Sequence, residues 1–163
     1  PVDTLHVRDE LALADYLDGG GQVLLSSQDY MDDAFRTFFN RAYLGVGMYL
    51  PNVGASSVSG VPGTPMWENL GPYFLAPPSP GAEAINPNPG SLPIFQNEAG
   101  LTDALGTDSG TWRSLFLAWP FENLAPPDAS TVMAASMDWL DIVPRPVVSF
   151  TVSASTVCIT SIT

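Results

Sequence analysis

The first part of the chain alternates between amphipathic and fully apolar segments. A first helix is predicted between an N-cap at Thr4 or His6 and the glycines that start at Gly19, with one buried face because apolar side chains recur three and four positions apart. These side chains are Val7, Leu11, Ala14 and Leu17. Three glycines at 19–21 end this helix, since glycine accepts the positive φ of a helix stop. The apolar run at 22–26 then predicts a short parallel strand that is covered on both faces.

A second helix is predicted over residues 31–44, with Asp29 as its N-cap. Its apolar stripe is Met31, Phe35, Phe38, Phe39 and Ala42. Glycines at 45 and 47 end this helix, and a short strand is predicted at 48–50.

Residues 51–100 have a different texture, with proline and glycine every few positions. Prolines at this density exclude helices and central strands. The segment is nevertheless too apolar to be a linker. It predicts a long insertion of short strands and ordered loops that packs on the domain, and a long structured loop of this kind can also carry function.

Regular structure returns after residue 90. Strands are predicted at 92–95, 101–105 and 112–119, followed by a helix from Asp128 to about residue 141. The pattern predicts an α/β domain over 1–143, with a mostly parallel sheet and flanking helices. Residues 144–163 predict a linker and two strands, which cannot bury a core alone and would begin a β-sandwich module.

Charge narrows the classes of partner. The chain has 17 acidic residues against five basic ones, and its net charge is −12. This balance disfavours nucleic acids and anionic membrane surfaces, which both require basic patches. No apolar run approaches the roughly 20 residues that span a bilayer, and Cys158 is the single cysteine, so neither an intrachain disulfide nor a cysteine zinc site is expected. Because the sequence opens at Pro1, we expect a processed product or a piece of a longer chain.

The candidate site is a group of carboxylates at the carboxyl ends of two predicted strands. Asp29, Asp32 and Asp33 follow the strand at 22–26, and Glu122 follows the strand at 112–119. If these strands are neighbours, Glu122 approaches Asp29, and Asp29, Asp32 and Glu122 become candidate ligands for Ca²⁺, the one cofactor considered. The alternative is structural: Asp29 caps the second helix, and Asp32 and Asp33 complement its dipole.

The same segments suggest two possible catalytic arrangements. Asp29 and Glu122 could form the acid/base pair of a glycoside hydrolase. A Ser27–His6 dyad lacks the glycine pattern of a nucleophile elbow, and His6 fits better as a cap or surface residue. No residue is therefore assigned a catalytic role.

Three segments resemble a known family. Residues 16–29 (Tyr-Leu-Asp-Gly-Gly-Gly-Gln-Val-Leu-Leu-Ser-Ser-Gln-Asp) and 116–122 (Phe-Leu-Ala-Trp-Pro-Phe-Glu) are similar to flavodoxin-like domains related to class I glutamine amidotransferases. The helix at 128–140 resembles the closing helix of that group, and 147–151 resembles the first strand of PKD or other Ig-like modules. Such domains are accessory parts of large secreted bacterial proteins, many of them peptidases.

The resemblance implies a non-catalytic accessory or interaction domain, located outside the cell or on its surface. Its partners would be domains of the same polypeptide or an extracellular protein. It also implies that a strand before the first helix is missing, which would leave an open sheet edge or one filled by another chain. Two alternatives remain: a structural subunit of an extracellular assembly that pairs its terminal strands, and a hydrolase using Asp29 and Glu122.

Overall fold

The computed structural model describes residues 5–34, 37–141, 151–153 and 156–158. Its helices are α1 (Val7–Asp18), α2 (Tyr30–Asp33), α3 (Phe38–Ala42), the short 3-10 helix η1 (Phe121–Asn123) and α4 (Pro126–Trp139). Its strands are β1 (Gln22–Ser26), β2 (Val46–Leu50), β3 (Ala55–Gly60), β4 (Tyr73–Ser79), β5 (Ala84–Pro87), β6 (Ser91–Asn97), β7 (Thr102–Asp108), β8 (Arg113–Leu117), β9 (Thr151–Ser153) and β10 (Thr156–Cys158).

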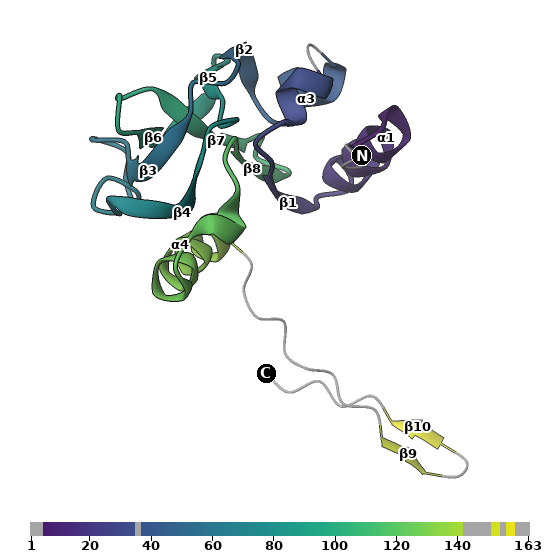
Figure 1. The fold of residues 1–163 in the computed structure, drawn as a ribbon. Helices are drawn as coiled ribbons and strands as arrows, with labels where there is room; N and C mark the ends of the chain where they lie inside the picture. Colours follow the sequence, from purple (N-terminus) through teal and green to yellow (C-terminus); the bar gives the residue numbers. More distant parts are fainter. Residues whose placement is uncertain (1–4, 35–36, 142–150, 154–155, 159–163) are drawn as a thin grey trace.

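The main sheet is mixed and curled, with six strands in the order β1-β8-β7-β6-β3-β4 (Figure 1). Only β1 and β8 run parallel, and every other neighbouring pair is antiparallel. The prediction of a flavodoxin-like, mostly parallel α/β sheet is therefore wrong. The physical reason is the short connections: β6, β7 and β8 follow one another through tight turns, whereas parallel neighbours need a crossover of a dozen or more residues.

Helices cover both faces of this sheet. Helices α1, α2 and α3 pack on one face, together with the separate antiparallel pair of β2 and β5. Helix α4 packs on the other face (Figure 1). Successive side chains of β8 point to opposite faces of the sheet. Phe116 packs with α1, α2 and α3, whereas Leu115 and Leu117 pack with α4. None of the described helices is long and apolar enough to cross a membrane.

The predicted helix faces are partly wrong. On α1, Leu17 is buried as expected, but Val7 and Leu11 are 68% and 61% exposed. The helix turns instead so that Glu10 is buried, because its carboxylate accepts a hydrogen bond from the Tyr30 hydroxyl. The predicted second helix is two short helices, α2 and α3, and Phe38 points outward with 77% of its surface exposed.

The segment rich in proline contributes β3, β4, β5 and β6. The expectation that its prolines exclude central strands is wrong for β6, which pairs with β7 on one side and β3 on the other although it contains Pro93. The register of β6 against β7 shifts between Pro93 and Phe95, and such a bulge is where an interior strand tolerates proline.

The last predicted unit lies largely outside the described residues. Strands β9 and β10 form an antiparallel pair, with Val157 opposite Val152. The predicted boundary near residue 143 is not tested by this pair.

A buried carboxylate and an open sheet edge as candidate functional sites

Glu83 is a buried carboxylate that lies near the carboxyl end of β1, beside α2. Its side chain is fully buried, and its Oε1 atom accepts a hydrogen bond from the Asp32 backbone N–H at 3.1 Å. The Glu83 N–H in turn donates to the Ala118 carbonyl at 3.1 Å, which holds the residue beside the end of β8. Glu83 therefore caps the first turn of α2 from a distant part of the chain.

The environment of Glu83 favours its neutral form. Burial raises the pKa of this carboxyl to about 8, and the charges of Asp32 and, to a smaller extent, Asp29 act in the same direction. The backbone N–H groups of Met31 and Asp32 oppose the shift in pKa. The second oxygen, Oε2, has no hydrogen-bond partner among the described residues. Asp29, Asp32 and Glu83 are thus near enough to interact electrostatically.

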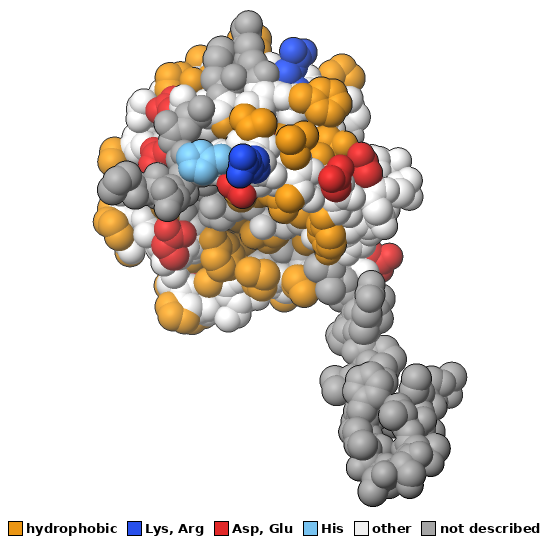
Figure 2. Space-filling model, turned by 90° about the vertical axis from the view of Figure 1, so that its right-hand side faces the viewer, with side chains coloured by type: hydrophobic (Ala, Val, Ile, Leu, Met, Phe, Trp, Pro, Cys, Tyr) orange, Lys and Arg blue, Asp and Glu red, His pale blue; other side chains and the backbone are white. Residues whose placement is uncertain are grey.

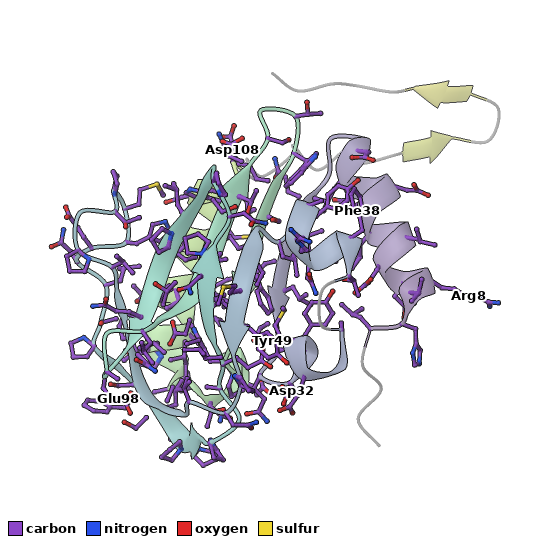
Figure 3. The ribbon with its side chains drawn as sticks, turned by 90° about the horizontal axis from the view of Figure 1, so that it is seen from above. Arg8, Asp32, Phe38, Tyr49, Glu98 and Asp108 are labelled. Carbon is purple, nitrogen blue, oxygen red and sulfur yellow. The ribbon has the colours of Figure 1, made fainter. Side chains whose placement is uncertain are left out.

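The structure places the predicted site residues as follows. Asp29 is at the N-cap position of α2, but its carboxylate makes no capping hydrogen bond. Asp32 is exposed on α2, where it lies on the same side of the molecule as Tyr49 (Figure 3). Glu122 is exposed on η1, and nothing is described of the Asp33 side chain.

These carboxylates do not converge as metal ligands. In the described part of the chain, no group of three or more His, Cys, Asp or Glu side chains is arranged to hold a metal ion. Sequence reasoning missed Glu83, although a glutamate between the apolar residues Ala82, Ala84 and Ile85 was a visible signal of a buried charge.

The segments that contain Ser27 and His6 make hydrogen bonds that stabilise the local backbone. Ser26, beside Ser27, donates from Oγ to the Trp119 carbonyl at 2.8 Å and accepts from the Phe121 N–H at 3.0 Å. His6 is the N-cap of α1, and its backbone N–H donates to the Asp9 carboxylate at 2.9 Å.

A second buried carboxylate, Asp103, lies in the core at the start of β7. It is fully buried, and both of its side-chain oxygens are without hydrogen-bond partners among the described residues. Burial raises the pKa of Asp103 well above its usual value, and the charge of Glu98 adds to this. The Asp103 backbone and, to a smaller extent, the Trp119 indole oppose this rise in pKa. Asp103 is enclosed and offers no surface to a ligand.

The most accessible feature is the outer side of β1, which we call the β1 edge. Strand β1 ends the six-stranded sheet, and no described strand pairs with its outer side. All five of its residues are half-buried, none is charged, and its register with β8 is regular throughout. The β1 edge therefore lacks three of the devices that prevent another strand from pairing, namely a charged residue, a proline and a bulge.

Backbone alternation shows which groups the β1 edge offers. The Ser27 N–H donates to the Leu117 carbonyl at 3.0 Å, so Ser27 faces β8. Successive residues of a strand direct their N–H and C=O groups to alternate sides. The residues whose backbone groups point away from β8 are consequently Gln22, Leu24 and Ser26.

The opposite end of the sheet is protected. Strand β4 contains Pro77 and Pro78, which lack an N–H to donate, and its register with β3 is irregular. Leu75 of β4 also forms an isolated bridge with Leu124. The two edges of this sheet thus differ: among the described strands, β1 is a regular edge without proline, and β4 is an irregular edge with two prolines.

Apolar side chains accompany the β1 edge. Figure 2 looks onto the side of the molecule where α1 lies, and hydrophobic side chains are spread across it. On α1 itself, Val7, Leu11 and Tyr16 are all more than half exposed. A partner that reaches β1 would meet apolar surface beside it.

Comparison with known proteins gives a fold and no family. No family model matches the chain, and no curated protein matches it. Among solved structures, the chain is similar to the beta-galactosidase from Rahnella sp. R3, with a TM-score of 0.59 and 15% sequence identity. The match covers 89% of this chain and 22% of that one, so the chain corresponds to about a fifth of the enzyme.

This similarity corrects the sequence-based resemblance. One similar solved structure is a beta-galactosidase, and the curled, mostly antiparallel sheet of this chain is not a flavodoxin-like one. The assignment to glutamine amidotransferase-like domains followed by a PKD or Ig-like module is therefore wrong. The motif at residues 16–29 contains the end of a helix, a glycine turn and a strand. This succession of elements occurs in more than one fold.

Proposed function

We propose that this chain is a non-catalytic interaction domain that binds another polypeptide by accepting an extended segment at the β1 edge. The observation that carries the proposal is the open, regular and uncharged strand at one end of an otherwise protected sheet. A segment added there would pair with the backbone groups of Gln22, Leu24 and Ser26. Main-chain hydrogen bonds provide affinity in this mode of binding, and side-chain contacts provide selectivity.

The roles of the polar residues support a binding role over a catalytic one. Glu83 caps α2, and Ser26 joins the end of β1 to the Trp119–Phe121 segment. No observation favours the hydrolase with Asp29 and Glu122, because both side chains are exposed and the Asp29 carboxylate is bonded to its neighbour Gln28. The similarity to a beta-galactosidase supports the fold alone, since the chain matches 22% of that enzyme.

The proposal does not include terminal-strand pairing or an extracellular location. Pairing through the terminal strands depends on residues that are mostly outside the described part of the chain. The extracellular location followed from the family resemblance, which the sheet does not support, so it is not part of this proposal.

The test is selection of short extended peptides from a displayed library on the immobilised chain. Selected peptides are then measured against two variants, Leu24→Lys in β1 and Phe74→Lys in β4. Phe74 is 69% exposed on the opposite edge, so its replacement adds the same charge at the wrong place. The melting temperature of each variant shows that it is folded.

The proposal expects peptides that lose binding with Leu24→Lys, keep it with Phe74→Lys, and protect the Leu24 and Ser26 amides from hydrogen exchange. A selection on monomeric chain that yields no peptide, or only peptides that protect other regions, would overturn it.

A further inference from the structure

We infer that the β1 edge pairs with the β1 edge of a second copy of the chain, antiparallel across a two-fold axis at Leu24. The two six-stranded sheets then continue as one. This inference rests on the proposed function, because it requires the β1 edge to accept a strand. It goes further by naming the partner.

The backbone of β1 is complementary to itself. In an antiparallel pair, residues directly opposite each other can exchange both of their hydrogen bonds. With the axis at Leu24, this residue lies opposite Leu24 of the partner subunit, and Gln22 lies opposite Ser26 of the partner subunit. These are the residues whose N–H and C=O groups face outward. A shift by one residue would set outward groups against inward ones and lose the pairing.

The side chains of β1 are complementary in the same register. Val23 would lie opposite Leu25 of the partner subunit, on the sheet face covered by α1, while the two Leu24 side chains would meet on the face covered by α4. Cross-strand apolar pairs stabilise a sheet. The five residues of β1 bring no like charges together, although the chain carries 17 acidic residues.

The overall charge sets the conditions for this dimer. Two chains with a net charge of −12 repel each other, and the repulsion is screened as salt is added. The Debye length falls from about 10 Å at 0.1 M to about 3 Å at 1 M ionic strength. Salt should therefore strengthen a dimer held by apolar and backbone contacts, whereas it would weaken one held by ion pairs.

Sedimentation equilibrium over a range of protein concentrations tests the inference. Gln22→Pro removes one outward N–H at the first position of the strand, where proline is tolerated. Leu24→Lys places two ammonium groups against each other at the axis. Phe74→Lys, on the protected edge, is the matched control.

We expect the unmodified chain to form dimers whose affinity rises with salt. Leu24→Lys and Gln22→Pro should each raise the dissociation constant by about tenfold or more, equivalent to about 1.4 kcal/mol. Phe74→Lys should leave it unchanged. A single cooperative thermal transition in each variant would show that it is folded, since loss of the dimer by itself lowers the melting temperature.

Three results would overturn the inference: a monomer at every concentration and salt, a dimer insensitive to both β1 variants, or an assembly larger than two. If the chain is monomeric while selected peptides still bind the β1 edge, the inference falls and the proposed function stands. If the chain is monomeric and no peptide binds there, both fall.

Discussion

The Tyr30 hydroxyl donates to Oε1 of Glu10 at 2.5 Å and joins α1 to α2 across the buried face of the first helix. The Thr37 hydroxyl donates to the same oxygen at 3.1 Å and brings in the start of α3. One buried carboxylate thus connects the three helices on this face of the sheet. It also explains why α1 buries Glu10 and leaves Leu11 exposed.

Removal of the Tyr30 hydroxyl should destabilise the fold. In Tyr30→Phe, the buried Glu10 carboxylate keeps only the Thr37 donor, and a buried polar group that loses a partner costs about 1 to 3 kcal/mol. Urea unfolding measures the difference in the free energy of unfolding. Tyr16→Phe is the control, because Tyr16 is 56% exposed. Equal losses in the two variants would contradict the structural role of the bond.

Glu83 should make the chain less stable as pH rises. Its pKa is about 8 in the folded chain against 4.5 as the ordinary value, so the folded state binds more protons between these pH values. The contribution of Glu83 is fully present below pH 4.5 and is lost as pH rises towards 8, with a slope of up to about 1.4 kcal/mol per pH unit.

Glu83→Gln keeps an oxygen that can accept the Asp32 N–H and removes this slope. The free energy of unfolding is measured by urea denaturation from pH 5 to 8. The value for Glu83→Gln should rise relative to that of the wild type as pH increases. Glu122→Gln, at an exposed position, is the control. A difference between wild type and Glu83→Gln that is constant with pH would refute the assignment.

Asp103, like Glu83, should make the folded chain less stable as pH rises. Burial raises its pKa well above 3.8, so the stability present at low pH is lost as pH rises above that value. Asp103→Asn should flatten the dependence of unfolding free energy on pH. Asp108→Asn is a useful contrast: hydrogen bonding from the Gly110 N–H and the nearby Arg113 lower the pKa of Asp108, so its stabilising effect is lost only below pH 3.8. Similar pH profiles for the two variants would contradict this account.

Hydrogen exchange should alternate along β1. In dilute, monomeric solution, the outward amides of Leu24 and Ser26 should exchange faster than those of Val23, Leu25 and Ser27, which face β8. Site-resolved NMR exchange provides the rates. Uniform protection along the strand would show that something already covers the β1 edge.

Calcium should leave the chain unchanged. Because the described carboxylates form no metal-ligating group, the melting temperature should be the same with added Ca²⁺ and with a chelator. A ligand that binds only the native state would raise it. A rise that Asp29→Asn or Glu122→Gln abolishes would establish the calcium site considered from the sequence.

Local features could be predicted from the sequence because they depend on neighbouring residues. The strand at 22–26 has the predicted bounds, and its pairing with β8 is parallel. The helix near 128–140 forms at Pro126–Trp139, since proline fits the first helical turn. The grouping of Asp29 and Asp32 near one strand end also follows from their spacing.

Tertiary structure decided the rest. An apolar strand has the same pattern whether its neighbour is parallel or antiparallel, so the short connections and pairing energies of β6, β7 and β8 set their directions. Glu83 reaches α2 from 51 residues away, a contact that no local pattern encodes. For β1, the sequence determined an uncharged apolar strand, and only the assembled sheet placed that strand at an edge, where no described strand pairs with its outer backbone groups.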